Sequence, residues 1–450
     1  MRIHFIAIGG SAMHNLAIAL HKKGYEITGS DDIIHEPSSS RLKTFGLLPK
    51  KFGWFEGNVT TDLDIVILGM SAKSDNPELL RAKDLGLKIY SYPEFLYEHS
   101  RMKTRVVIGG SHGKTTITSM ILHVLKYHEV DTDYMVGAQI EGFENMVHLT
   151  DSNDFIVLEG DEYLSSPIDM RPKFHLYKPN IALLSGIAWD HINVFPTFEN
   201  YREQFAIFTE SLTNGGIMVY NEEDDNVVKV VETSQNSIKR YPYSTPDYSI
   251  VDGITYIDTS DGPMPLQVFG EHNLQNLAGA KWICQHMGID EDDFYEAIES
   301  FKGANKRLEK LAESRKTLIF KDFAHSPSKV KATTLAVKNQ YKSKLILACL
   351  ELHTYSSLNK EFLKEYQGAL DEVDEAVVFY SPEAVKIKRL EEVSVEQIKK
   401  SFNIKNLRVF TNPKEFKSFL FSTSLEDRVL LLMSSGNYGG LNLEELKVLV

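Results

Sequence analysis

A glycine-rich segment that contains one lysine and two threonines carries the strongest chemical signal in the sequence. Residues 110–116 read GSHGKTT and follow a short apolar run. In a loop of this kind, backbone N–H groups surround ATP phosphates, the lysine supplies charge to the β- and γ-phosphates, and the first threonine hydroxyl binds Mg²⁺. The full pattern has a glycine where this chain has Ile108, so the loop is a shortened form. We predict an ATP site here, with a chance Gly-Lys-Thr at a helix start as the alternative.

Carboxylates and a histidine follow the next two strand-like runs. A nucleoside-triphosphate site needs a metal-holding carboxylate at a nearby strand end, and Glu159 follows directly after the apolar run 155–158. A solvated acidic turn is the alternative interpretation of this segment. Asp190-His191 comes shortly after the apolar run 181–184. His191 is therefore a candidate metal ligand or phosphate contact, unless its role is structural.

A second glycine loop, residues 9–13 (GGSAM), lies between the first expected strand and the first expected helix. Small residues there let the backbone approach a phosphate at the helix N-terminus. Asp31 lies about 20 residues further on, where a dinucleotide-binding fold places its ribose-binding acid. The glycine pattern of such folds is broken at Ile8 and Met13. We expect a nucleotide or nucleotide-sugar phosphate rather than NAD, with a merely structural turn as the alternative.

Alternating strands and helices must position these loops. Short apolar runs separated by helical patterns predict mainly parallel sheets, and 450 residues allow about three domains at roughly 150 residues each. We predict an α/β fold of three domains. These are a Rossmann-like N-terminal domain (1–103), a P-loop central domain with a mainly parallel sheet (104–303) and a Rossmann-like C-terminal domain (304–450). Within the central domain, the turn-rich region 214–265 is expected to hold short β-like runs.

Composition narrows the class of protein. Apolar residues make up 42% and charged residues 25% of the chain, as in ordinary globular proteins. Lys and Arg number 49 against 62 Asp and Glu, and this net charge of −13 argues against a general nucleic-acid or membrane-surface binder. No apolar run reaches the ~18 residues of a spanning helix. Two cysteines, Cys284 and Cys349, cannot build a disulfide framework or a Cys-based zinc site. We expect a cytoplasmic protein.

In their order along the chain, residues 110–116, 159–162 and Asp190-His191 resemble the Mur ligases, which are ATP-dependent amide-forming enzymes of peptidoglycan synthesis. The resemblance covers essentially the whole chain. Residues 270–276 are similar to the family's Gly-x-His-Asn-x-x-Asn segment on the adenine side of ATP. Residues 306–309 resemble its Arg-Arg-x-Glu segment, and residues 321–327 resemble its Asp-Tyr/Phe-Ala/Gly-His-x-Pro segment.

The resemblance implies a role for each candidate residue. The implied catalytic residues are Lys114, Glu159 and His191, and the implied ligands of Mg²⁺ (or Mn²⁺) are Thr115, Glu159 and His191. ATP would be bound by Gly110, Ser111, His112, Gly113, Lys114, Thr115, Thr116, His272, Asn273, Asn276, Arg307, Asp322 and His325. The other substrates would be bound by Gly9, Gly10, Ser11, Ala12, Met13, Asp31, Ser71, His353 and Tyr438.

The same resemblance narrows the choice of substrates. Members that add later residues often carry a carbamylated lysine fourteen residues after the motif histidine, where this chain has Phe205. The subset without it acts on UDP-N-acetylmuramate itself. Residues 171–174 and 432–441 look closer to the members that rejoin recycled L-alanyl-γ-D-glutamyl-meso-diaminopimelate, which we take as the predicted amine. Addition of L-alanine is the alternative.

The implied partners are UDP-N-acetylmuramate and a small peptide or amino acid, with no nucleic acid, no membrane, and a monomer or weak homodimer as the assembly. Four positions differ from the usual family pattern: His14, Asn193, Ser326 and His353. Two other classes stay open. One is a catalytically weak protein that keeps the fold and binds the nucleotide sugar, and the other is an NAD-dependent oxidoreductase, which the broken glycine pattern opposes.

Overall fold

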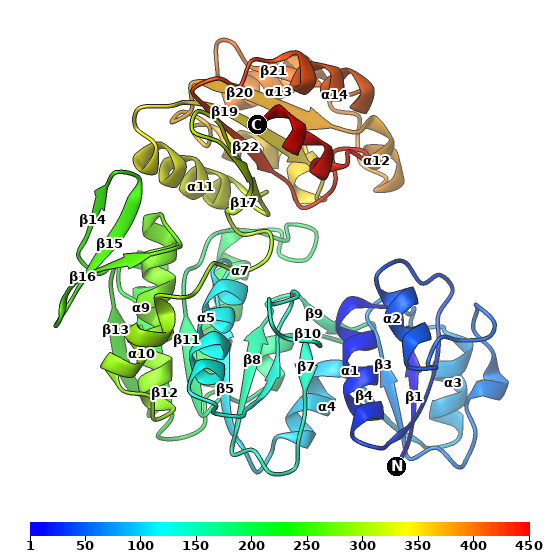
Figure 1. Cartoon of the computed structure of the whole chain (residues 1–450). Coiled ribbons are helices and arrows are strands. Elements are labelled where there is room, and N and C mark those ends of the chain that lie inside the picture. Colours follow the sequence, from blue (N-terminus) through cyan, green and yellow to red (C-terminus); the bar gives the residue numbers. More distant parts are fainter. The chain divides into compact units, whose positions relative to one another are not determined.

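The computed structural model describes residues 1–450 (Figure 1). These residues form two compact units. The first unit contains Met1–Ile187, Arg202–Tyr243 and Gly279–Phe294, and the second contains Ala188–Tyr201, Ser244–Ala278 and Tyr295–Val450. None of the helices combines the length and the apolar character that crossing a membrane requires. The structure confirms an α/β fold with mainly parallel sheets, while the domain boundaries at residues 103 and 303 stay predictions.

The N-terminal part of the first unit is a four-stranded parallel sheet in the order β2-β1-β3-β4. Its elements are β1 (Arg2–Ile6), α1 (Ser11–Lys22), β2 (Glu26–Ser30), α2 (Ser38–Thr44), β3 (Ile65–Leu68), α3 (Pro77–Asp84), β4 (Lys88–Ser91) and α4 (Tyr92–His99), with a 3₁₀ turn at Glu56–Asn58. Gly24 ends the first helix with φ +91°, which is the left-handed conformation that glycine adopts without strain. Because β1 lies between β2 and β3 and all three strands are parallel, their carboxyl ends lie side by side. The first glycine loop follows β1 at this end of the sheet.

The central sheet has seven strands in the order β13-β12-β11-β5-β8-β6-β7, all parallel except β7. The strands are β5 (Thr104–Gly109), β6 (Asp133–Met135), β7 (Val147–His148), β8 (Phe155–Gly160), β11 (Ile181–Leu184), β12 (Ile217–Asn221) and β13 (Lys239–Tyr243). The helices are α5 (Lys114–Tyr127), α6 (Lys173–Leu176), α7 (Phe198–Glu210), α8 (Asp225–Glu232), α9 (Glu271–His286) and α10 (Glu291–Ile298). A hairpin of β9 (Leu164–Ser166) and β10 (Asp169–Pro172) follows β8. The neighbouring strands β5, β8 and β11 are almost wholly buried, as expected for parallel strands that are covered on both faces.

The second unit contains a small antiparallel sheet of β14 (Tyr248–Val251), β15 (Ile254–Thr259) and β16 (Gly262–Leu266), and a six-stranded sheet in the order β17-β18-β22-β19-β20-β21. Its strands are β17 (Glu309–Glu313), β18 (Leu318–Asp322), β19 (Leu345–Leu352), β20 (Glu375–Tyr380), β21 (Arg408–Phe410) and β22 (Arg428–Met433), all parallel except β17. Its helices are α11 (Pro327–Gln340), α12 (Pro382–Ile387), α13 (Val395–Phe402) and α14 (Pro413–Ser422), with 3₁₀ turns at Ser356–Leu358, Phe362–Tyr366 and Leu443–Leu449.

Alternating residues of the six-stranded sheet face two separate apolar clusters. Phe320 and Leu431 belong to one cluster, whereas their neighbours Ile319 and Leu430 belong to the other. Successive side chains of a strand point to opposite faces, so the sheet is buried on both sides. Strand β22 is inserted between β18 and β19, out of its order in the sequence. Crevices at the carboxyl ends of such strands are the usual ligand sites of open α/β sheets.

Candidate active site

The phosphate-binding loop joins β5 to α5 and is held against the end of β11. Gly110 and Gly113 have φ values of +137° and +80°, a range that side chains rarely adopt. A Cβ atom on Gly110 would lie 2.1 Å from Ser185 Oγ. The Ser111 N–H donates to the Gly186 carbonyl at 2.9 Å. Both glycines are therefore needed for this backbone path, which leaves the helix N-terminus open for an anion.

We expect Gly110→Ala to weaken the binding of Mg²⁺ and ATP by about 5- to 150-fold. The new methyl group meets Ser185 and forces a strained φ, which together cost on the order of 1–3 kcal/mol at a site that must keep its shape. Calorimetric titration with a non-hydrolysable ATP analogue measures the change. Gly57→Ala is the control, because nothing lies within 4 Å of its added Cβ. Equal affinity in wild type and Gly110→Ala would contradict this reading of the loop.

Lys114 is held as a cation next to a buried carboxylate. Its Nζ lies 2.5 Å from Glu162 Oε2 and donates to the Gly110 carbonyl at 2.6 Å. Burial lowers the pKa of Lys114, but Glu162, Asp161 and Glu159 outweigh it and raise the pKa above its usual value. The ammonium group is thus charged at neutral pH. Glu162 was not among the predicted site residues, although it stands in the same acidic turn as Glu159.

Thr115 and Glu159, two of the three predicted metal ligands, lie in direct contact. The Thr115 hydroxyl donates to Glu159 Oε1 at 2.9 Å, and the Gly137 N–H donates to Glu159 Oε2 at 2.7 Å. Mg²⁺ prefers oxygen ligands and typically takes few from the protein, with phosphates and water as the rest. One hydroxyl and one carboxylate at the phosphate loop fit that preference. His191 belongs to the second unit, so its part in a metal site stays a prediction.

Asp31, the predicted ribose-binding carboxylate, holds the first glycine loop in place. The Gly9 N–H donates to Asp31 Oδ2 at 2.8 Å, and a Cβ on Gly9 would come within 2.9 Å of that oxygen. Burial raises the pKa of Asp31 to about 6, against the lowering effect of the Gly9 N–H. No side chain caps helix α1 after Gly10, so its first N–H groups remain for an anion. Ser71 is exposed just after β3, at the same sheet edge.

In the second unit, two motifs that are far apart in sequence meet at Asp190. Lys329 Nζ lies 3.5 Å and His325 Nε2 lies 4.0 Å from Asp190 Oδ2. The His191 N–H donates to Asp190 Oδ1 at 2.8 Å. Burial alone would raise the pKa of Asp190. The charges of Lys329, His191 and His325 together outweigh burial, so the pKa of Asp190 lies below its usual value. Lys329, which no sequence motif singled out, therefore lies with the predicted site residues His325 and His191 around Asp190.

Acid is expected to destabilise the folded chain through His325. Burial, helped by Lys329, lowers the pKa of His325 to about 4, whereas an unfolded histidine has a pKa of about 6.5. Between these values the unfolded state binds more protons, so stability falls as pH drops from about 6.5 toward about 4. We expect the loss of unfolding free energy between pH 7 and pH 5 to be about 2 kcal/mol smaller in His325→Gln.

Urea unfolding at both pH values, followed by tryptophan fluorescence, measures this difference. The exposed His35 provides the matched control, since His35→Gln should keep the acid sensitivity of the wild type. An equal acid loss in His325→Gln and wild type would show that His325 does not carry the effect.

The residues predicted to bind ATP in the second unit have different surroundings. Asp322 accepts the N–H groups of Leu308 and Ala324, each at 2.7 Å, so its carboxylate holds the turn after β18. The Arg307 guanidinium lies 4.7 Å from the centre of the Phe323 ring. The other three predicted residues are His272, Asn273 and Asn276, of which the two asparagines are buried. His272 Nδ1 is inaccessible to solvent and has no hydrogen-bond partner, which is the state that a bound ligand would relieve.

The carboxyl ends of β19 and β22 are joined by Glu351. Its buried carboxylate accepts the Tyr438 N–H at 2.8 Å and the Ser434 hydroxyl, while His353 Nδ1 lies 3.8 Å away. His353 is 40% exposed in its side chain and remains a candidate substrate contact. Tyr438 requires a correction. Its side chain is fully buried and its hydroxyl donates to the Cys349 and Met433 carbonyls, so it anchors the core instead of contacting a substrate.

Two family models match the chain. The model described as "Mur ligase family, catalytic domain" matches residues 2–104, and the model described as "Mur ligase middle domain" matches residues 108–284. Curated relatives are similar over most of the chain. The UDP-N-acetylmuramate–L-alanine ligase of Sulfurihydrogenibium sp. (strain YO3AOP1) is 31% identical over 447 residues, covering 97% of this chain and 95% of the relative. That of Persephonella marina is 32% identical over 374 residues, with 81% and 79% covered.

Solved structures share the fold. The murein peptide ligase of Psychrobacter arcticus 273-4 has a TM-score of 0.70 at 20% identity, covering 100% of this chain and 99% of that one. The UDP-N-acetylmuramate–alanine ligase of Thermotoga maritima has a TM-score of 0.71 at 21% identity, with 100% and 98% covered. These likenesses confirm the predicted three-domain α/β architecture.

Proposed function

The chain belongs to the Mur ligase family of peptidoglycan-synthesis enzymes, and on that premise we propose that it joins an amine to the lactyl carboxylate of UDP-N-acetylmuramate with conversion of ATP to ADP and phosphate. One arrangement carries the proposal. Lys114 is paired with Glu162 and Thr115 is paired with Glu159 at the start of one helix, which provides a cation and a metal-holding carboxylate for the ATP phosphates. Because ATP and nucleotide sugars are cytoplasmic metabolites, the proposed reaction takes place in the cytoplasm.

In the proposed reaction, the lactyl carboxylate attacks the γ-phosphorus of ATP, ADP leaves, and an acyl phosphate forms. The amine nitrogen then attacks the acyl carbon and loses a proton, and inorganic phosphate leaves with the electrons of the C–O bond. Lys114 stabilises the negative charge of the phosphoryl group in transfer. Thr115 and Glu159 are the residues that would hold Mg²⁺, which supplies further neutralisation of phosphate charge when bound.

For the amine we favour L-alanyl-γ-D-glutamyl-meso-diaminopimelate. Support comes from residues 432–441, whose sequence resembles that of the recycling members. Within this segment, Ser434 and Tyr438 are fastened to Glu351 at the carboxyl end of β19. L-Alanine is the second candidate, because the curated relatives at 31% and 32% identity are named as L-alanine ligases.

Phosphate release distinguishes the two amines. The purified full chain is mixed with Mg²⁺, ATP and UDP-N-acetylmuramate, and either the tripeptide or L-alanine is added in parallel. Turnover with the tripeptide alone supports the recycling assignment, whereas turnover with L-alanine moves it to the first step of stem-peptide synthesis. Binding of UDP-N-acetylmuramate without phosphate release under either condition would overturn the proposal of a ligase and favour a binding protein.

A further inference from the structure

Asn15 fastens the first glycine loop to a segment of the central part of the first unit. It is fully buried in the first turns of α1, which follows the loop. Its Nδ2 donates to the Ser11 carbonyl at 2.8 Å, and its Oδ1 accepts the Met146 N–H at 3.3 Å. Its backbone carbonyl accepts Asn145 Nδ2 at 3.1 Å. Helix α1 and strand β7 are in contact, as Figure 1 also shows.

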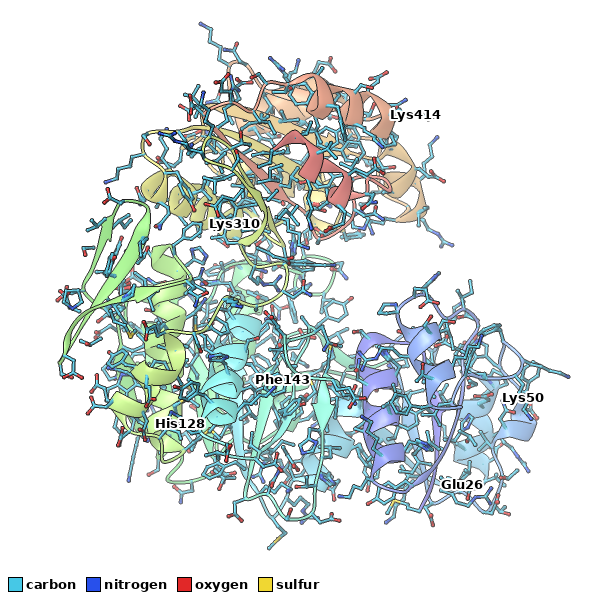
Figure 2. All side chains as sticks on the ribbon, in the orientation of Figure 1. Glu26, Lys50, His128, Phe143, Lys310 and Lys414 are labelled. Carbon is cyan, nitrogen blue, oxygen red and sulfur yellow. The ribbon has the colours of Figure 1, made fainter.

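The series of hydrogen bonds that starts at Asn15 continues through the segment 136–146, which precedes β7. Phe143 marks it in Figure 2. The Val136 N–H donates to the Met146 carbonyl at 3.0 Å, and the next residue, Gly137, donates its N–H to Glu159 Oε2 at 2.7 Å. The other oxygen of Glu159 accepts the Thr115 hydroxyl. Short polar contacts therefore lead from Ser11 in the first glycine loop to Thr115 in the phosphate-binding loop, all within one compact unit.

Neighbouring side chains hold the Asn15 amide in one orientation. His14 Nε2 lies 3.0 Å from Asn15 Nδ2, and His14 Nδ1 lies 2.9 Å from the Gly10 carbonyl. A carbonyl can only accept, so Nδ1 carries the proton and Nε2 accepts from the amide. Burial, with a smaller effect of Arg41, lowers the pKa of His14, which keeps this ring neutral. Both Nδ2 hydrogens and Oδ1 of Asn15 are thus used, and a flipped amide would lose these bonds.

Arg41 braces the far side of the segment. Its guanidinium donates to Gln139 Oε1 at 3.2 Å, to the Glu144 carbonyl at 3.1 Å and to Asn145 Oδ1 at 2.8 Å. Like Asn15, it comes from the N-terminal sheet and its helices. The 136–146 segment is therefore held at two points by the part of the chain that carries the first glycine loop.

We propose that Asn15 is a positioning residue that couples the nucleotide-sugar loop to the metal-holding carboxylate Glu159. This inference rests on the proposed function. Nucleotide sugar that orders the Gly10–Ser11 turn would also order the Asn15 amide, the 136–146 segment and the Gly137 N–H that orients Glu159. Coupling between two binding sites is reciprocal. UDP-N-acetylmuramate therefore strengthens the binding of Mg²⁺ and ATP through this path, and the reverse holds equally.

Calorimetric titration of the full chain tests the coupling. The affinity for a non-hydrolysable ATP analogue with Mg²⁺ is measured with and without saturating UDP-N-acetylmuramate. We expect the sugar to strengthen analogue binding in the wild type about fivefold or more. In Asn15→Ala we expect a ratio near one, while the affinity for the analogue alone changes less than threefold. Asn58→Ala is the matched control, because it removes a side-chain bond to Glu78 in the same sheet domain but lies outside the path.

Asn15→Ser provides a second variant if Asn15→Ala does not fold, since serine keeps a polar group but is too short to reach Met146. Persistence of the wild-type ratio in a folded Asn15 variant would overturn the inference, and so would a ratio of one in the wild type. Failure of the wild type to bind UDP-N-acetylmuramate at all would overturn the proposed function as well. Binding of both ligands without coupling would overturn the inference alone.

Discussion

Replacement of Lys114 by methionine is expected to lower ATP-dependent phosphate release at least ~10³-fold, because the charge that stabilises the phosphoryl group in transfer is lost. Lys114 is charged at neutral pH, with a raised pKa beside Glu162, and its Nζ is held in place by the Gly110 carbonyl. Methionine has a similar length and cannot replace that charge. Release of phosphate in the presence of saturating UDP-N-acetylmuramate and amine measures the effect.

The same substitution also removes the Lys114 cation from the buried Glu162 carboxylate. Glu162 is 1% exposed, and breaking a buried ion pair by removing one partner typically costs about 3–5 kcal/mol. A double variant separates this loss from the chemistry. Lys114→Met with Glu162→Gln should regain most of the stability and none of the activity. Turnover within tenfold of the wild type in either variant would refute the role of Lys114.

Replacement of Glu159 by glutamine is expected to lower turnover about 10²–10³-fold and to raise the Mg²⁺ concentration needed for half-maximal activity, since charge neutralisation by a bound metal contributes several kcal/mol. The amide keeps the size of the side chain and can still accept the Gly137 N–H. It cannot offer Mg²⁺ a negative charge beside the Thr115 hydroxyl.

A Mg²⁺ titration of phosphate release in Glu159→Gln and wild type measures both effects. Glu361→Gln serves as the control, because that exposed residue directly precedes a 3₁₀ turn of the second unit and is not assigned to any site. An unchanged Mg²⁺ requirement in Glu159→Gln would show that the metal is held elsewhere.

Local sequence patterns were sufficient to predict a fully buried central strand, but not every other element. The strand-like run 181–184 was predicted at the bounds that the structure gives to β11, Ile181–Leu184. Residues 214–265 were expected to hold short β-like runs, but they also contain helix α8. The edge strands β17 and β21 were not predicted. Edge strands are only partly buried, so their sequences lack the continuous apolar run of a central strand.

The phosphate-binding loop and its partner Glu159 could be predicted from the amino-acid sequence because their chemistry depends on residues that are close together in the chain. Glycines with positive φ, a lysine at a helix start and a carboxylate at a strand end each act through a few adjacent residues, so their spacing is enough to predict them. The family resemblance rests on the same short segments, and the comparisons with known proteins confirmed it.

Contacts between distant segments, in contrast, depended on the strand order and on burial. Lys329 meets Asp190 across 139 positions of the chain, and Lys114 meets Glu162 across 48. Tyr438 was predicted to touch substrate, yet its ring is packed in the core because β22 lies between β18 and β19. Which charges become neighbours, and which side chains lose contact with solvent, is set by tertiary packing, since neither follows from the spacing of residues within one segment.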